Sequence, residues 1–232
     1  MHATALRPTS RDTALVENVK AYALNPSFPC LGARSAINSK RAHFASYGQV
    51  GRDDPVQLKA LCKALAAFSD VYPNPGEAPV TYIALFDNDV RDEEEFERRL
   101  WRHLQLLHCS DRRKFDWAPR VSSDAQSCNF SFSIAGRAFF VVGLHPYASR
   151  IARRSPVPCL VFNFHNQFEQ LKASGKYEKL QRSIRIRDIA LQGNINPVLA
   201  RFGEASEARQ YSGRAVSAGW QCPFRSGARD AS

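Results

Sequence analysis

Hydrophobic positions recur at helical spacing in two long stretches of the chain. In residues 55–68 the apolar positions lie three or four residues apart, which predicts an amphipathic helix. A second stretch begins with seven carboxylates in residues 87–97, and its apolar face then carries Phe96, Leu100, Leu104 and Leu107. Because acidic side chains interact favourably with the positive end of a helix dipole, we expect a second helix with a solvated first turn.

Three other stretches are rich in β-branched and aromatic residues and predict strands. Residues 80–86 and 159–164 are short apolar runs. Residues 129–144 fall into two halves around Ala135-Gly136-Arg137, the pattern of a hairpin. After the last strand we expect a short helix from Gln167 and a longer one over 176–191. The apolar face of the longer helix carries Tyr177, Leu180, Ile184 and Leu191.

Strands interleaved with helices predict an α/β or α+β fold with a mixed central sheet flanked by helices. A chain of 232 residues suits a single domain, which we expect over residues 1–232 with its core at about 16–224. The polar ends, 1–15 and 225–232, are expected to fray. The chain has no apolar run of membrane-spanning length and no apolar signal core, so we expect a cytoplasmic protein without a membrane partner.

The charge suggests an anionic partner. Lys and Arg number 32 against 22 Asp and Glu, a net charge of +10. Nucleic acid, a membrane surface or a ligand with phosphate or carboxylate groups would all suit this balance. RNA-binding signatures are missing, as are the P-loop, GxGxxG, GxSxG and HExxH motifs, so the charge has no nucleic-acid motif to accompany it.

Candidate chemistry is concentrated in three polar stretches. In residues 28–36 Cys30 is followed by Gly32 and Arg34, which suits either a thiolate made acidic by positive charge or a buried thiol in a turn. In residues 143–154 a β-rich run ends at His145, where a side chain can face a ligand crevice as a metal or haem ligand. The same strand-then-histidine arrangement recurs at His165.

Arginines follow the first of these histidines. Arg150, Arg153 and Arg154 are suited to pair with carboxylates or phosphates, although a satisfied turn histidine before a basic surface helix explains the same pattern. The third stretch, 185–214, combines arginines, carboxylates and amides near turns at Gly193 and Pro197. Such a set suits a pocket for a polar small molecule, or a solvated helix–loop–helix.

Six segments together resemble the YqcI/YcgG family and extend from residue 28 to 224. They are FPCLGARSA (28–36), LWRHLQLLH (100–108), FSFSIAGRAFFVVGLHPYASRIARR (130–154), LVFNFHNQFEQL (160–171), IRIRDIALQGNINPVLARFGEASEARQYSGR (184–214) and WQCPF (220–224). Within the family they are most similar to haem-dependent N-hydroxylases of guanitoxin and D-cycloserine biosynthesis. The resemblance implies a b-type haem enzyme that hydroxylates a guanidine nitrogen of L-arginine or a related compound in specialised metabolism.

The implied haem needs an axial ligand and cations for its propionates. We expect His145 as the axial ligand, with His165 and Cys30 as alternatives. The cations expected at the cofactor are Arg34, Arg150, Arg153 and Arg154.

The implied substrate is a planar guanidinium, which carboxylates bind through two hydrogen bonds. Glu204 and Glu207 are the first candidates, followed by Asp188. The other residues expected around the substrate are Arg185, Arg209, Tyr211 and Arg214. The reaction would also need an electron donor or peroxide, and the protein is a candidate homodimer. A haem sensor or carrier without catalysis, and a basic nucleic-acid-binding protein, are the alternative functions.

Overall fold

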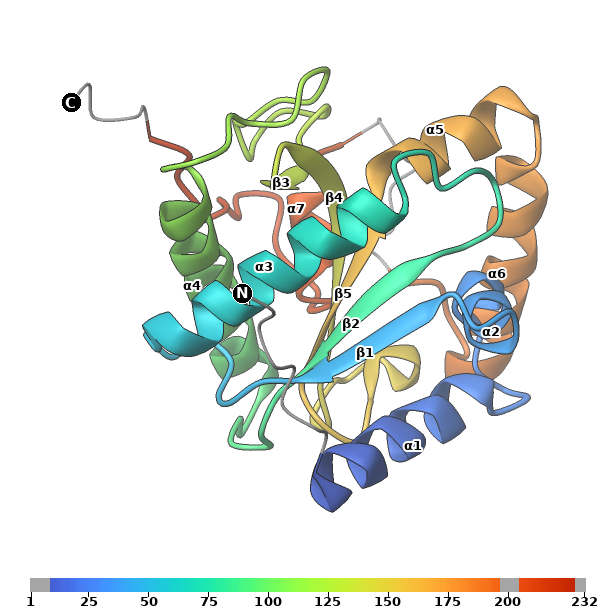
Figure 1. The fold of residues 1–232 in the computed structure, drawn as a ribbon. Coiled ribbons are helices and arrows are strands. Elements are labelled where there is room, and N and C mark those ends of the chain that lie inside the picture. The colour runs from blue at the N-terminus through green and yellow to red at the C-terminus, as the bar shows by residue number, and fades with distance from the viewer. Residues whose placement is uncertain (1–8, 197–204, 228–232) are drawn as a thin grey trace.

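A computed structural model describes residues 9–196 and 205–227, which fold around one five-stranded sheet (Figure 1). The strand order is β1-β2-β5-β4-β3. β1 and β2 are parallel and every other pair is antiparallel, so the predicted mixed sheet flanked by helices is confirmed. The strands are β1 (Ala42–Ser46), β2 (Thr81–Leu85), β3 (Phe132–Ile134), β4 (Arg137–Leu144) and β5 (Cys159–Phe164).

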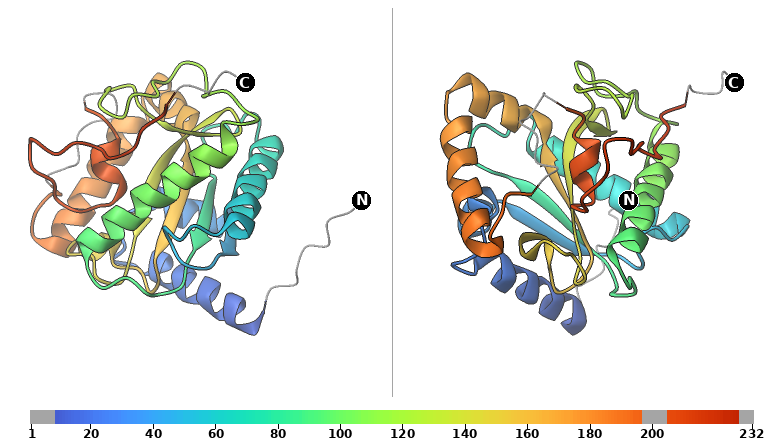
Figure 2. Two further views of the ribbon diagram at one scale, coloured as in Figure 1. Left: turned by 90° about the vertical axis from the view of Figure 1, so that its left-hand side faces the viewer. Right: turned by 180° about the vertical axis from the view of Figure 1, so that it is seen from behind.

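Helices lie on both sides of the sheet (Figure 2). α3 and α4 cover one side, α1, α2 and α6 lie on the other, and α5 follows the end of β5. The helices are α1 (Ser10–Leu24), α2 (Leu31–Asn38), α3 (Pro55–Val71), α4 (Glu93–Asp111), η1 (Ile151–Arg153), α5 (His165–Ala173), α6 (Tyr177–Gln192) and α7 (Ala208–Tyr211). Among the described residues, no helix combines the length and apolar character that a bilayer crossing requires.

Both long helices begin at a capping carboxylate, and the acidic first turn of α4 is as expected. The Asp54 carboxylate accepts the N–H groups of Val56 and Gln57 at the start of α3, where Pro55 occupies the first turn. The Asp92 carboxylate accepts the Glu95 N–H at 2.7 Å in the acidic first turn of α4. The expected hairpin turns at Ala135 and Gly136, both with positive φ, as a type I′ turn requires.

Three elements near the N-terminus were not anticipated. α1 begins at Ser10, inside the stretch 1–15 that was expected to fray, because Thr9 and Asp12 form a capping box. α2 occupies the segment interpreted as a Pro/Gly turn, and Cys30 is its N-cap residue. β1 pairs with β2 although it has no alternation of buried and exposed side chains.

The start of α5 also differs from the prediction. The helix begins at His165 rather than at Gln167.

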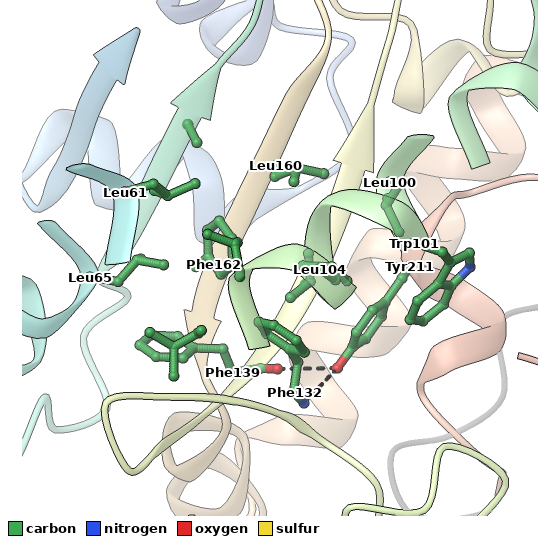
Figure 3. Packing of buried hydrophobic residues seen from close by; sticks show 14 of the residues in the cluster. Leu61, Leu65, Leu100, Trp101, Leu104, Phe132, Phe139, Leu160, Phe162 and Tyr211 are labelled. Atoms are coloured by element: carbon green, nitrogen blue, oxygen red, sulfur yellow. Dashed lines mark hydrogen bonds between the residues drawn. The ribbon is translucent and has the colours of Figure 1, made fainter. Parts of the chain in front are cut away.

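The main hydrophobic core fills the space between the sheet and the α3–α4 side (Figure 3). Tyr211 is fully buried there, and its hydroxyl donates to the Phe139 carbonyl at 3.1 Å and accepts the Phe132 N–H at 3.2 Å. Gly143 lets β4 approach α4 closely, because a Cβ atom at this position would lie 2.6 Å from Leu100 and 2.7 Å from Phe96.

The opposite side of the sheet is covered less completely. On β4 the side chains of Phe139 and Val141 are buried, whereas those of Phe140 and Val142 are only partly buried. On β5 Val161 is also partly buried. The expected apolar face of α6 is half-buried throughout, and the buried side chain of this helix is the charged Asp188. This side of the sheet therefore keeps apolar surface that the described residues do not fully cover.

Candidate functional site

The two strand-end histidines lie at opposite ends of the β4–β5 pair. β4 and β5 are antiparallel, with Leu144 opposite Cys159 and Phe139 opposite Phe164. His145 follows the last residue of β4 and His165 follows the last residue of β5. The same sequence arrangement therefore produces two sites that are separated by the length of the strands.

His145 belongs to the packed core. It is 1% exposed, and its ring stacks on Phe96 of α4 with ring centroids 4.3 Å apart. Its backbone N–H donates to the Arg153 carbonyl at 3.0 Å, and its Nδ1 is enclosed without a hydrogen-bond partner. Burial lowers the pKa of His145 to about 4, so the ring is neutral near pH 7.

His165 has a carboxylate beside each ring nitrogen. It is 6% exposed at the start of α5, and its Nδ1 lies 3.6 Å from Oε1 of the buried Glu207. Its Nε2 lies 4.0 Å from Oε1 of Glu169, one turn along α5, whose side chain is 43% exposed. One nitrogen thus faces an enclosed carboxylate, and the other faces a carboxylate that reaches the surface.

Glu207 is held from several directions just before α7. It is 2% exposed, and its Oε2 accepts the Ser131 hydroxyl at 3.2 Å. Burial raises the pKa of Glu207, while the neighbouring His165 ring and the Ser131 and Tyr211 hydroxyls counter this shift. Glu207 was expected to bind the substrate guanidinium, but its observed contacts are to the chain's own imidazole and hydroxyl groups.

Cys30, the third candidate ligand, lies at the start of α2. Its Sγ accepts the Ala33 N–H at 3.4 Å, and burial raises the pKa of the thiol. Of the two alternatives for Cys30, this environment favours the buried thiol over the acidic thiolate, because desolvation outweighs the backbone N–H groups and the charge of Arg153.

The expected cofactor arginines have different partners. Arg150 is buried and donates to the Asp188 carboxylate at 2.5 Å and to the Asn194 side chain, so its charge is already neutralised. Arg34 donates to the Pro26 carbonyl at 3.3 Å, and Arg154 donates to the Ala148 carbonyl at 3.0 Å.

Arg153 differs from these three. Its guanidinium donates to two carbonyls, those of Gly143 at 3.0 Å and Gln210 at 3.1 Å. Burial lowers the pKa of Arg153 to about 10. No carboxylate of the described residues forms an ion pair with it, and Asp188 acts on its charge only from a distance. α7 connects it with the histidine site, since Glu207 precedes this helix and Gln210 lies within it.

The expected substrate residues are not brought together. Arg214 donates to Glu97 at 2.6 Å, and Arg209 donates to the Ser217 carbonyl at 2.5 Å. Tyr211 lies in the core and Asp188 holds Arg150. Arg185 is half-buried on α6, and Glu204 lies outside the described residues. Arg209, Tyr211 and Arg214 thus have partners within the chain, and their expected role at a substrate stays a prediction.

Two residues of the histidine site escaped the sequence analysis. Ser131 stood in an expected strand, and nothing in its neighbourhood marked it as a partner of Glu207. Glu169 was predictable in principle, because it lies four residues after His165 and the two share one face of a helix.

The side chains around His165 could give a metal centre one protein ligand. Within residues 9–196 and 205–227, no group of three or more His, Cys, Asp or Glu side chains is arranged to hold a metal ion. A haem brings four ligands of its own and needs only one axial donor, so this finding leaves haem compatible with the structure. For such a haem, His165 would be a donor with a carboxylate behind it, and Arg153 would be a cation without an ion-pair partner among the described residues.

A model of the YqcI/YcgG family matches residues 17–225. The chain belongs to the YqcI/YcgG family. The motifs quoted above for this YqcI/YcgG protein begin at Phe28, but the family match begins at residue 17. The match therefore includes the second half of α1. Searches of curated proteins and of solved structures found no match.

Proposed function

We propose that this chain is a haem b-dependent N-hydroxylase of L-arginine or a related guanidino compound, with His165 as the axial ligand. The observation that carries this proposal is the buried Glu207 carboxylate, 3.6 Å from His165 Nδ1. Histidines that ligate metals regularly donate their other N–H to a carboxylate, which fixes the ring and raises its basicity. The N-hydroxylase reaction itself rests on the family resemblance.

Glu207 would keep the proton on Nδ1 and leave the lone pair of Nε2 for iron. Glu169 is the nearest carboxylate to Nε2, and its exposed side chain can turn to solvent without burying a charge. His145 offers no such arrangement, because its ring stacks on Phe96 and no carboxylate of the described residues forms an ion pair with it. This contrast favours His165, the second choice of the sequence analysis, over His145.

Arg153 would receive a propionate. A buried guanidinium without a carboxylate partner gains most from an added anion, because the cost of its desolvation has already been incurred. The partly buried Phe140 and Val142 would contact the apolar ring system. When bound, haem would supply the oxidising iron centre, and the chain would supply its ligand, charge balance and enclosure.

The substrate-binding residues stay a prediction. Asp188 already binds a guanidinium, that of Arg150, which is the geometry a substrate guanidinium would need. Asp188 could bind the substrate guanidinium only if the Arg150 guanidinium first left its carboxylate.

Turnover by protein produced with ample haem tests this function. L-Arginine and an electron donor, or peroxide, are supplied, and mass spectrometry follows the product. We expect an arginine product heavier by one oxygen atom, formed by wild type and lost in His165→Ala. A haem-loaded protein without turnover on any guanidino compound would support the sensor or carrier. A colourless protein whose DNA affinity falls steeply with salt would support nucleic-acid binding.

A further inference from the structure

A separate cavity is lined by the last turn of α4, the segment 112–123, Ser133 of β3 and the C-terminal residues 226–227. Figure 1 shows where α4 ends. Its volume is about 350 Å³. Polar groups in its wall include Asp111, His108 and Ser133, with the charged Arg112 and Asp116, and aromatic rings come from Phe115 and Trp117. None of the three candidate haem ligands lines it.

Asp111 is the unusual group of this cavity. It is 7% exposed, yet its carboxylate receives a single N–H, that of Ala135, at 3.0 Å. A carboxylate can accept about four hydrogen bonds, and buried carboxylates are ordinarily paired with a cation. Burial raises the pKa of Asp111 to about 6, and the causes of this shift include no nearby positive charge.

The position of Asp111 in the fold adds to this deficit of positive charge. It is the last residue of a 19-residue helix, where the helix dipole presents its negative end. Arg112 also lines the cavity, but its Nη1 donates to the Gly227 carbonyl at 3.3 Å rather than to Asp111. A positive charge is therefore favoured in the cavity both by the buried carboxylate and by the end of the helix.

We propose that this cavity binds a small organic cation, a primary ammonium with an apolar body. The ammonium donates to Asp111, and the apolar body contacts the rings of Phe115 and Trp117. Aromatic faces attract cations as well as apolar groups, so the same walls serve both parts of the ligand. This site does not depend on haem, and its failure would leave the proposed hydroxylase untouched.

Calorimetric titration of the full chain with benzylammonium at pH 8 tests the proposal, with benzyl alcohol as a neutral analogue of the same shape. We expect saturable binding of benzylammonium and at least about tenfold weaker binding of benzyl alcohol, the usual effect of a charge-assisted hydrogen bond. Asp111→Asn should weaken benzylammonium binding by a similar factor. Asp53→Asn, the same change at an exposed position, should leave it unchanged.

A second measurement keeps the test valid if Asp111→Asn folds poorly. Carbon NMR of the wild-type carboxyl groups should place the pKa of Asp111 near 6 in the free protein and lower with benzylammonium bound, because a cation favours the ionised form. Equal binding of the ammonium and the alcohol, no saturable binding, or an Asp111 pKa unmoved by the ligand would overturn the proposal.

Discussion

His145 and His165 have the same position relative to their strands and opposite surroundings. His145 stacks on an aromatic ring in the α4 core, and no ion pair involves its side chain. His165 lies between a buried and an exposed carboxylate. The difference shows that a strand-end histidine becomes a ligand candidate through what its second nitrogen contacts. A hydrophobic ring contact stabilises the fold, whereas a carboxylate sets which nitrogen is available for a metal.

The largest effect on stability is expected when the ring of His145 is removed. His145→Ala should lower the free energy of unfolding by about 4 kcal/mol, because it leaves a cavity against Phe96. His145→Phe keeps a ring of similar size and should recover most of this loss. Unfolding of wild type and both variants in denaturant measures these free energies. If His145→Ala is as stable as wild type, the ring does not have the packing role assigned here.

The pH dependence of stability gives the next largest effect. The pKa of His145 is about 4 in the folded state against 6.5 as its reference, so the unfolded chain takes up the proton first as the pH falls. The contribution of the neutral His145 ring to the free energy of unfolding is therefore complete above pH 6.5 and is lost between pH 6.5 and about pH 4. The loss amounts to at most about 3.5 kcal/mol at about 1.4 kcal/mol per unit of pKa shift.

The difference in unfolding free energy between wild type and His145→Phe should follow this curve. Subtracting the two proteins cancels the other groups with shifted pKa, such as His103 and Asp111. A difference that stays constant from pH 7 to pH 4 would mean that His145 is not a neutral core residue.

Substitution of Glu207 tests the proposed role of His165 as the haem ligand. Glu207→Gln should weaken haem binding about 10- to 100-fold, the usual cost of losing a carboxylate behind a ligating histidine. Glu94→Gln, at an exposed position in the first turn of α4, is the matched control and should bind haem normally. Haem titration followed by absorbance measures both. Unchanged affinity in Glu207→Gln would remove the main support for His165.

The smallest effect is expected at Glu169. Its side chain is 43% exposed and 4.0 Å from Nε2 of His165, so solvent screens its charge. Glu169→Gln should therefore change haem affinity by less than about threefold, which corresponds to the small energies of exposed charge pairs. A larger loss in this variant than in Glu207→Gln would reverse the roles assigned to the two carboxylates.

Local signals were sufficient for much of the fold. The spacing of apolar residues predicted α3, and the turn at Gly136 predicted the hairpin. β1 was not predictable, because its side chains are all half-buried and its identity as a strand comes from pairing with β2. The start of α1 was obscured by polar residues that in fact form its cap.

The site was less predictable than the fold. Both histidines were identified as candidates, and the sequence analysis placed His145 first. The carboxylate that distinguishes His165 left no sequence signal, because Glu207 reaches His165 only through the placement of α7. Arg150 was expected to serve an anion of the cofactor, and its pairing with Asp188 depends on α6 packing beside η1. Long-range contacts of this kind follow from the tertiary packing and leave no local pattern in the sequence.

Rescue by imidazole tests the central claim, axial ligation by His165, most directly. His165→Gly and His145→Gly are loaded with haem, with and without free imidazole, and their absorption spectra are compared with that of wild type. We expect His165→Gly to lose haem and to regain the wild-type spectrum with imidazole, while His145→Gly keeps haem without it. Loss and rescue at His145 instead, or a ferrous–CO spectrum of the thiolate type that disappears in Cys30→Ala, would contradict the account.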